Sequence, residues 1–459
     1  ATPYGGSCNF HSANFDPLLG IGAFYDQRLG CGGCERIMRK EKIFLDQKAQ
    51  EVLEGNDKGG YTIPTAGLYP YQWNWDSAFA AWGFSVFDTK RAWQEIETLF
   101  AGQWPNGMLP HILFRQDDPD YFPGPTVWGT EGIGPISSSG ISQPPVAATF
   151  IRAIWERDQQ IGTDHLLSLL PKIKAWHKWF MNWRISPEGA VFVTHPWEAG
   201  RDNSADWDSA MAMIIPKGIG EYKRRDTSHV DPSMRPTKAD YDRYLWLVQR
   251  GNRLGWDEAR MVEEQPFAVA DPTLTFILLR ANKDLAFMNK SLGLPTEEID
   301  RWSRTLEMGC ESLRHPESKH FNAINLKSGE HTGYLTSASF LCWYAGIRDK
   351  NMLDILKRTL INNLYPVPSL DSGSNKFDGL RYWRGPTWPV LNALIGLGLS
   401  DMGYEKEAEI LRSKTRDLIS QNGFAEYFHP KTGAPGGGEA FSWTAAVWLA
   451  WASPSVGEK

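Results

Sequence analysis

The sequence predicts an all-α fold, an (α/α)6 barrel in which long loops gather on one face and form the active site. Three observations predict it. About twelve stretches show helical periodicity, strand signals are few and short, and long segments rich in Gly, Pro and aromatic residues separate alternate helices. Helical hairpins with long connections at one end form a ring of helix pairs. The rival, an open α-solenoid, would repeat at a fixed period of about 34 or 40 residues, and no such repeat is present.

The helices are predicted from apolar residues that recur every three to four positions. Between residues 164 and 183, Leu169, Ile173 and Trp176 fall on one face. Pro171 interrupts this stretch and predicts a kink or a restart. The other helices are expected near 35–53, 76–86, 89–102, 145–160, 237–254, 272–291, 297–313, 335–346, 350–363, 387–402 and 405–420.

Start and stop signals support these helices. Thr237 with Asp240 fits a capping box, and Pro295 followed by acids suits a first turn. Glycines stand where helices should end, at Gly293, Gly346, Gly403 and Gly423. The best strand candidate is Ala190 to Thr194.

The long connecting segments are where function is expected, because loops of this length are usually functional. They are residues 56–75, 103–144, 192–236, 366–386 and 422–441. No linker separates two folded domains. We therefore predict an N-terminal extension, 1–34, and one catalytic barrel, 35–459, with inserted loop regions near 103–144 and 215–240.

Charge and hydropathy argue against several kinds of partner. The chain has 48 Lys and Arg against 54 Asp and Glu, a net charge of -6, whereas nucleic-acid binders normally present a basic face. No apolar run of about 18 residues predicts a membrane span, and no signal peptide is visible. We expect a cytoplasmic protein that binds neither nucleic acid nor membrane; a leader removed before Ala1 and a homo-oligomer are both compatible with the sequence.

The five cysteines are an odd number and cannot all pair, which favours a reducing compartment. Cys31 and Cys34 form a single CxxC motif. A structural zinc site normally needs a second pair of ligands at short spacing, so a disulfide or free thiols are expected there rather than a metal, although His11 lies nearby in sequence.

Aromatic residues make up 13% of the chain, including 21 Trp. Indole rings stack on sugars while their N–H groups donate hydrogen bonds, although a Trp-rich core explains the composition equally well. Acids stand beside such rings in the long loops. The clusters are YPYQWNWDS (69–77), QWPNGMLPH (103–111), YFPGP (121–125), QPP (143–145), HPWEAGRDNS (195–204), RYWRGPTWP (381–389), GFAEYFHPKTG (423–433) and FSWTAA (441–446).

Two carboxyl groups from separate aromatic loops are what glycoside hydrolysis requires. One stays protonated and delivers a proton to the leaving oxygen, which burial favours by raising its pKa. The other stays ionised and acts as a nucleophile at a separation of about 5 Å, or activates water at about 6.5–9.5 Å. Phosphate-binding, HExxH and GxSxG motifs are absent, and Gly396-Leu-Gly398 is interpreted as helix packing.

The motifs QWNWDSAF, QWPNGMLPH, GISQPP, WEAGRDNS, YWRGPTW and EYFHPKTG with FSWTAA resemble glycoside hydrolase family 63. They look similar to those of its bacterial and plant mannosylglycerate and glucosylglycerate hydrolases, and they span residues 61 to 450. The resemblance implies an inverting hydrolase on an (α/α)6 barrel that needs no metal or organic cofactor. Its substrate would be an α-linked glucosyl or mannosyl unit on a small acceptor, with glycerate expected.

By motif position, the resemblance implies Asp202 as general acid and Glu426 as general base. It implies a glycosyl subsite formed by Tyr69, Trp73, Trp75, Asp76, His111, Gln143, Tyr382 and Trp383. Tyr121, Arg235 and Tyr241 would grip glycerate, and a guanidinium group suits this role because it holds a carboxylate through two charge-assisted bonds.

Several alternatives remain open. Glu198, Asp206 and Asp208 compete with Asp202, and Glu439 competes with Glu426. Asp76 could cap a helix, or it could hold two adjacent sugar hydroxyls. Arg235 could be a surface residue paired with Asp240. Two other functions also fit: an exo-α-glucosidase for neutral, trehalose-like substrates, and a non-catalytic carbohydrate-binding helical protein.

Overall fold

The computed structural model describes residues 32–456, with side chains from residue 44 onward. The chain divides into Ala1–Glu41 and a large compact unit, Lys42–Lys459. The CxxC side chains lie outside the described residues, whereas Cys310 and Cys342 are buried free thiols. The predicted boundary after residue 34 falls inside helix α1 (Gly32–Asn56).

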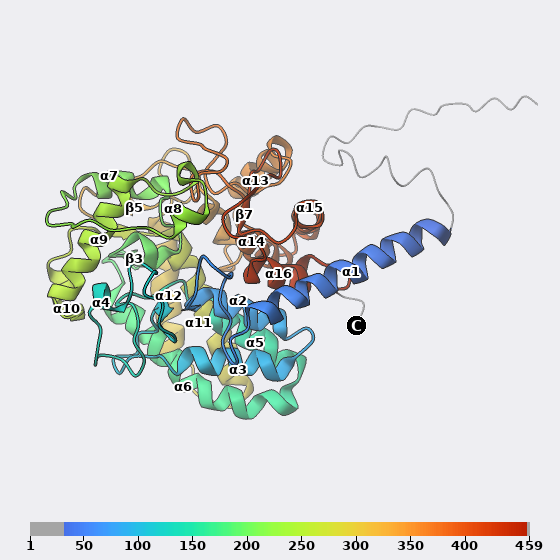
Figure 1. Cartoon of the computed structure of the whole chain (residues 1–459), viewed down its shortest axis with the longest axis horizontal. Helices are drawn as coiled ribbons and strands as arrows, with labels where there is room; N and C mark the ends of the chain where they lie inside the picture. The colour runs from blue at the N-terminus through green and yellow to red at the C-terminus, as the bar shows by residue number, and fades with distance from the viewer. Residues whose placement is uncertain (1–31, 457–459) are drawn as a thin grey trace, which may run out of the picture. The chain divides into compact units, whose positions relative to one another are not determined.

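The described chain is mostly helical (Figure 1). Its longer helices are α2 (Asn74–Phe84), α3 (Thr89–Phe100), α5 (Ala147–Arg157), α6 (Gln159–Trp183), α9 (Lys238–Arg253), α11 (Pro272–Ser291), α12 (Glu297–Ser312), α13 (Lys350–Asn362), α14 (Pro389–Asp401) and α15 (Glu405–Asn422). Shorter ones are α4 (Pro125–Trp128), α7 (Asp208–Ala212), α8 (Asp226–His229), α10 (Glu258–Glu263), α16 (Ser442–Val447) and the 3₁₀ helices η3 (Pro196–Ala199), η4 (Ala205–Trp207), η5 (Pro232–Met234) and η6 (Ser337–Cys342); η7 (Trp448–Ala452) is a π-helix.

Within the described residues, six inner segments contact one another in a closed ring: α16 packs on α2, α2 on α5, α5 on α11, α11 on η6, η6 on α14 and α14 on α16. The next helix in sequence packs outside five of them, as α3, α6, α12, α13 and α15 do. This arrangement is the predicted (α/α)6 barrel.

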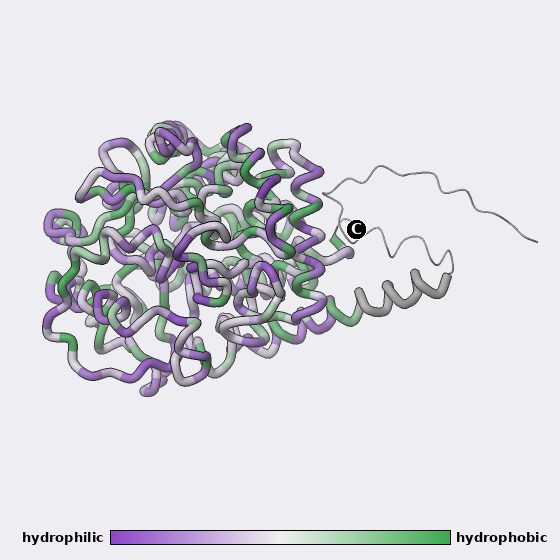
Figure 2. The backbone as a smooth tube through the Cα atoms, turned by 90° about the horizontal axis from the view of Figure 1, so that it is seen from above, coloured by the Kyte–Doolittle hydropathy of each residue, from purple (hydrophilic) through white to green (hydrophobic). Residues whose placement is uncertain are grey.

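Burial follows from position in the ring. Every residue of α2 and α16 is buried, whereas outer helices such as α3 and α12 have one apolar face and one polar face. Hydrophobic and hydrophilic residues alternate along many of these helices (Figure 2). Close contact in the ring requires small residues. A Cβ at Gly83 of α2 would lie 2.7 Å from Ala446 of α16, and one at Gly398 would lie 2.2 Å from the backbone N of Tyr344. Gly398 therefore serves helix packing, as predicted.

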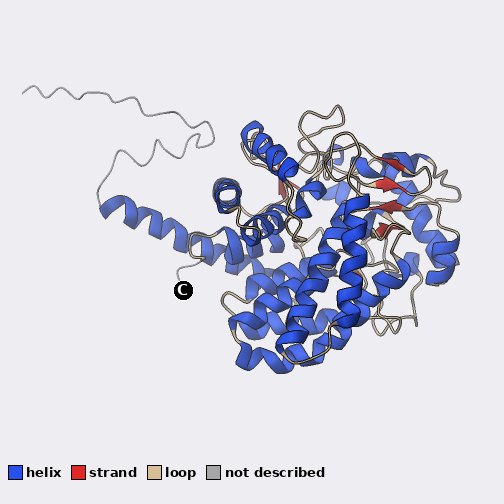
Figure 3. Cartoon of the chain, turned by 180° about the vertical axis from the view of Figure 1, so that it is seen from behind, coloured by secondary structure: helices blue, strands red, loops and turns tan. Residues whose placement is uncertain are grey.

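The described strands are short and peripheral to the helices. β3 (Phe192–Val193) lies within the predicted strand and begins an antiparallel sheet of order β3-β4-β5-β6, with β4 at Val269–Ala270, β5 at Ile324–Asn325 and β6 at Glu330–His331 (Figure 3). Two further pairs join β1 (Gln72–Trp73) to β2 (Ile112–Leu113) and β7 (Tyr427–Phe428) to β8 (Pro435–Gly436).

Two predicted helices differ in detail. The stretch 335–346 forms only the 3₁₀ helix η6. The Ser337 N–H donates to the distant Ser369 carbonyl, the Ser339 N–H donates to the carbonyl of Thr336 three residues earlier, and Gly346, at φ 82°, ends the segment. Helix α6 starts earlier than expected and continues through Pro171. Pro171 and Leu167 are both exposed, so water can satisfy the Leu167 carbonyl that has lost its partner. None of the described helices is long and apolar enough to cross a membrane.

Candidate active site

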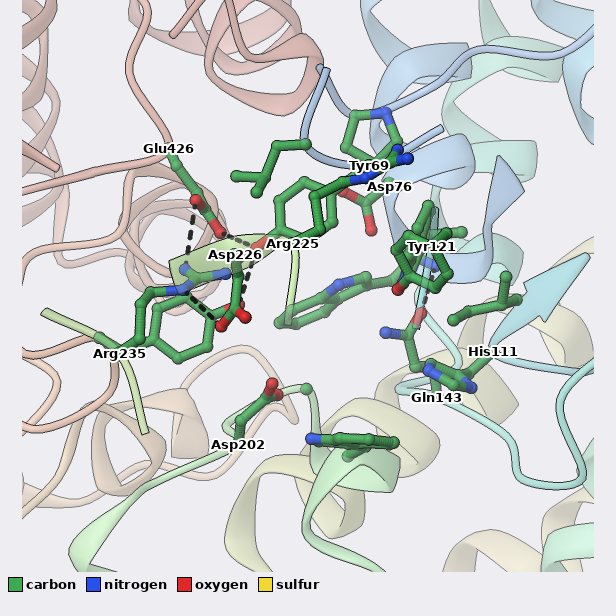
Figure 4. A pocket seen from close by; sticks show the side chains of 18 of the residues that line it. Tyr69, Asp76, His111, Tyr121, Gln143, Asp202, Arg225, Asp226, Arg235 and Glu426 are labelled. Atoms are coloured by element: carbon green, nitrogen blue, oxygen red, sulfur yellow. Dashed lines mark hydrogen bonds and ion pairs between the residues drawn. The ribbon is translucent and has the colours of Figure 1, made fainter. Parts of the chain in front are cut away.

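A cavity of about 110 Å³ opens where the loops that precede the inner helices converge. All five long segments singled out from the sequence contribute to its wall. Every residue predicted for the site lines it: Tyr69, Trp73, Trp75, Asp76, His111, Tyr121, Gln143, Asp202, Arg235, Tyr241, Tyr382, Trp383 and Glu426. Figure 4 shows Asp202 and Glu426 entering the pocket from different loops, with Arg235 on the Glu426 side.

Asp202 is half-buried in a loop that lines the pocket. It follows η3 and Gly200, and its neighbours Arg201 and Asn203 are both buried. Its backbone carbonyl accepts a hydrogen bond from the Tyr244 hydroxyl at 2.7 Å, while no ion pair within 4 Å reaches its carboxyl group from the described residues. Burial raises the pKa of Asp202 to about 7; the positive charge of Arg235 opposes this rise and the negative charge of Glu426 adds to it.

The residues beside Asp202 fix its backbone. Arg201 pairs with Asp206 at 2.7 Å and with Asp271 at 2.5 Å. The side-chain oxygen of Asn203 accepts a hydrogen bond from the backbone N–H of Trp383 at 2.8 Å. These contacts connect the loop that carries Asp202 to the aromatic wall of the pocket.

Glu426 lies just before β7 and is surrounded by donors. Its Oε2 accepts a hydrogen bond from the Gly438 backbone N–H at 2.9 Å, and its Oε1 accepts one from the Tyr69 hydroxyl at 3.1 Å. Arg235 Nη1 lies 3.7 Å from Oε2. Burial raises the pKa of Glu426, but Arg235 and these two hydrogen bonds oppose the rise because they favour the ionised form.

Arg235 is a buried pocket residue, only 3% exposed, so the surface interpretation is wrong. Its Nε donates to Asp226 Oδ2 at 3.1 Å and its Nη2 to the Tyr69 hydroxyl at 2.5 Å. The guanidinium carbon lies 4.1 Å from the centre of the Tyr382 ring. Asp240, its proposed surface partner, instead completes the capping box with Thr237 at the start of α9.

Aromatic rings form the remaining wall of the pocket. Trp383 stacks on Trp388 with ring centres 3.8 Å apart, and Trp75 lies 6.2 Å from Trp383. Tyr382 has a φ of 49°, a left-handed conformation that costs a non-glycine residue about 1–2 kcal/mol. Its hydroxyl lies 3.3 Å from that of Tyr69. Tyr382 therefore has a strained backbone and a ring that packs against Arg235.

The start of α2 supplies the polar residues on another side. Asp76 lies in the first turn, but Trp73 occupies the N-cap position, so Asp76 is not the cap. Burial, followed by the negative charge of Glu426, raises the pKa of Asp76 well above its usual range. Gln143 accepts a hydrogen bond from the Trp75 backbone N–H at 3.2 Å and so satisfies a donor that the helix leaves unpaired.

His111 and the two tyrosines predicted to bind the acceptor are also fixed by neighbours. His111 Nδ1 lies 2.6 Å from the Ser139 hydroxyl, and burial lowers its pKa well below the usual value, so it is neutral near pH 7. The Tyr241 hydroxyl donates to the Phe122 carbonyl at 3.3 Å. Tyr121 packs edge-on against Trp73 with ring centres 5.9 Å apart.

The competing acids all lie outside this pocket. Glu198 pairs with Arg184 at 3.0 Å, Asp206 pairs with Arg201, and Asp208 pairs with Arg384 and Lys376. Glu439 is exposed. Each of the first three carboxylates has a cationic partner, from the same loop in the case of Asp206 and from other segments in the case of Glu198 and Asp208. Asp202 is left as the unpaired acid of its segment.

Sequence reasoning missed several lining residues. Trp197, Phe441 and Trp443 stand inside the motifs and could have been chosen for their ring faces. Arg225 and Asp226 belong to the charged run 223–226, which would ordinarily lie on a solvated surface. Arg225 is held by a long-range ion pair with Asp118 at 2.5 Å. Asp226 pairs locally with Arg224 at 2.6 Å and also with the pocket residue Arg235 at 3.1 Å.

The arrangement combines a half-buried acid whose pKa is raised to about 7, a second carboxylate held by donors, a cation and aromatic faces. That set is suited to proton transfer onto a leaving oxygen while water is activated within the same sugar-sized cavity. The described residues contain no group of three or more His, Cys, Asp or Glu side chains that could hold a metal.

Comparisons with known proteins agree with this chemistry. A family model described as "Mannosylglycerate hydrolase MGH1-like glycoside hydrolase domain" matches residues 69–444. The chain is 42% identical to mannosylglycerate hydrolase from Thermus thermophilus over 88% of this chain and 99% of that protein, and 39% identical to mannosylglycerate hydrolase MGH1 from Selaginella moellendorffii over 95% and 91%. A crystal structure of a GH63 mannosylglycerate hydrolase from T. thermophilus, in complex with Tris, superposes with a TM-score of 0.85 at 41% identity, covering 89% of this chain and 99% of that one.

Proposed function

The chain belongs to the MGH1-like glycoside hydrolases of family 63, and from that premise we propose that it releases an α-linked glucosyl or mannosyl unit from glycerate with inversion at the anomeric carbon. Asp202 protonates the glycosidic oxygen as the bond to the anomeric carbon breaks. Glu426 takes a proton from the water that attacks that carbon. The products are the free hexose and glycerate.

One observation carries these roles: the two carboxyl groups have unequal surroundings. Asp202 is half-buried and has no cation within ion-pairing distance among the described residues, and desolvation raises its pKa to about 7. Glu426 accepts two hydrogen bonds and faces Arg235. Burial raises the pKa of both groups, but the donors and the cation around Glu426 favour its ionised form, which suits Glu426 to the role of base and Asp202 to that of acid.

The glycosyl unit would lie against Trp75 and Trp383, with Asp76 and Gln143 facing its hydroxyl groups. The acceptor would lie toward Arg235, Tyr121 and Tyr241. An anionic acceptor suits this side of the pocket because Arg235 is buried and presents an unpaired nitrogen, Nη1.

The test is a substrate panel on the full chain, with released hexose as the readout. We expect glucosylglycerate or mannosylglycerate to be hydrolysed with the highest kcat/KM, and the hexose to appear first as the inverted anomer by NMR. Trehalose or kojibiose as the better substrate would instead support the neutral exo-α-glucosidase, and binding without turnover would support a carbohydrate-binding protein. Appearance of the retained anomer would refute Glu426 as a base.

A further inference from the structure

Arg235 is held on two sides, and its third side faces Glu426 without a hydrogen bond. Nε is fixed by Asp226 and Nη2 by the Tyr69 hydroxyl, while the Tyr382 ring packs against the guanidinium plane. Nη1 is buried and makes no hydrogen bond with the described residues. A buried unpaired donor is unfavourable, so a pocket that retains one is suited to a ligand that supplies the acceptor.

The Nη1 nitrogen of Arg235 faces Glu426, the proposed base. Nη1 lies 3.7 Å from Glu426 Oε2, which is too long for a charge-assisted hydrogen bond of about 2.8 Å. Both groups are held by other partners, Glu426 by Gly438 and Tyr69, and Arg235 by Asp226 and Tyr69. The pair therefore interacts through charge without closing, and Nη1 keeps its donors for another anion.

We propose that Arg235 is shared between Glu426 and the acceptor carboxylate, so that binding of an anionic acceptor weakens the hold of Arg235 on Glu426 and makes Glu426 a stronger base. This inference rests on the proposed function, because it takes glycerate as the acceptor. A neutral acceptor of the same size leaves the cation on Glu426 and is therefore hydrolysed with a lower kcat, even when it binds. The preference for an anionic acceptor then appears in kcat, the chemical step, as well as in binding.

Other charged and titratable groups also face Glu426, and they define the controls. Asp202 and Asp76 are carboxyls of the same pocket, and Tyr69, Tyr382 and Tyr427 place hydroxyl groups around Arg235 and Glu426. The tyrosines stay protonated through the working range, because burial raises the pKa of each. Asp226 also bonds to Arg235, but Arg235 and Arg224 outweigh its burial and lower its pKa below the usual value, so it stays ionised near neutral pH. Proton uptake on acceptor binding could therefore come from Glu426, Asp202 or Asp76, and variants must separate the three.

The experiment is calorimetric titration of the full chain with glycerate in buffers of different ionisation enthalpy, from pH 4.5 to 8. We expect wild type to take up a fraction of a proton per chain in the acidic half of this range. Asp202→Asn and Asp76→Asn should retain that uptake, whereas Glu426→Gln should lose it and bind glycerate about tenfold more tightly near pH 7, because the competing carboxylate has been removed. Glycerol should cause no uptake.

A second measurement uses turnover and does not depend on how well the variants fold. By linkage, a tenfold coupling raises the pKa of Glu426 by about one unit in the complex. The acidic limb of the kcat profile of wild type should therefore lie about one pH unit higher with a glycerate glycoside than with the matching glycerol glycoside.

The proposal is overturned if wild type takes up no proton, if uptake survives in Glu426→Gln, if that variant binds glycerate no more tightly than wild type, or if the two acidic limbs coincide. Glycerate that fails to bind at all would also overturn it. In each of these cases the proposed function stands as long as glycerate glycosides are hydrolysed. If they are not hydrolysed, the proposed function itself fails.

Discussion

Replacing Asp202 with Asn removes the proposed proton donor and keeps the size of the side chain. No ion pair reaches the Asp202 carboxyl from the described residues, so the substitution breaks no salt bridge. General acid catalysis is typically worth about 10² to 10⁴ in rate, and we expect kcat for a glycerate glycoside to fall by that factor.

The magnitude also depends on pH. With a pKa of about 7, Asp202 is about half protonated at pH 7 and about one-tenth protonated at pH 8, so kcat/KM of wild type should fall nearly tenfold per pH unit above 7. Asp202→Asn has no such group, and its residual activity should lack this basic limb. A glycosyl fluoride, whose leaving group needs no proton, should be hydrolysed by the variant at a rate close to that of wild type.

Asp202→Asn should lower activity but raise the free energy of unfolding. The pKa of Asp202 is higher in the folded state than in the unfolded state, so wild type is progressively destabilised as pH rises from about 4 to about 7. A rise of about three pKa units corresponds to about 4 kcal/mol at most. Asp202→Asn should therefore gain stability over wild type across this interval, measured by urea unfolding at pH 4 and pH 7.5.

The matched control is Asp208→Asn, which alters a nearby carboxylate that is paired with Arg384 and Lys376 outside the pocket. It should keep the basic limb of the pH profile. The assignment of Asp202 is refuted if Asp202→Asn keeps near-wild-type kcat on the natural leaving group, or if the same basic limb persists in that variant.

Three further predictions follow from the same contacts. Glu426→Gln should lower kcat by at least about 10² for every leaving group, fluoride included, because the attacking water loses its base. The control Glu439→Gln changes an exposed carboxylate and should keep wild-type rates. Equal losses in both variants would contradict the choice of Glu426. Arg235→Gln should raise KM for a glycerate glycoside at least about tenfold and change KM for the glycerol glycoside much less; a uniform rise would mean that Arg235 does not read the acceptor charge. Arg184→Met leaves the buried carboxylates of Glu198 and Glu258 without their cation. It should lower the free energy of unfolding, measured by urea titration, by about 3–5 kcal/mol. A loss below about 1 kcal/mol would show that these ion pairs do not stabilise the fold.

Much of the helical framework could be predicted locally. Periodicity reports which face of a segment is buried, and caps such as Thr237 with Asp240 act within one turn of helix, so both are present in short stretches of sequence. The prediction of a full helix over 335–346 is wrong, and the local pattern could not show that the Ser337 N–H bonds to the distant Ser369 carbonyl.

Periodicity in the sequence predicted the ring of helix pairs and the long loops that carry the pocket, and the resemblance of the motifs to family 63 predicted the residues that line it, because both are present in short stretches of consecutive residues. Tertiary structure decided which carboxyl groups differ from their neighbours. Glu198, Asp206 and Asp208 pair with arginines, whereas Asp202 has no cation within ion-pairing distance among the described residues. It also brought the charged residues Arg225 and Asp226 into the pocket wall. The physical reason is that a pKa and an ion pair depend on desolvation and on charges contributed by remote segments, and these are set only when the chain has folded.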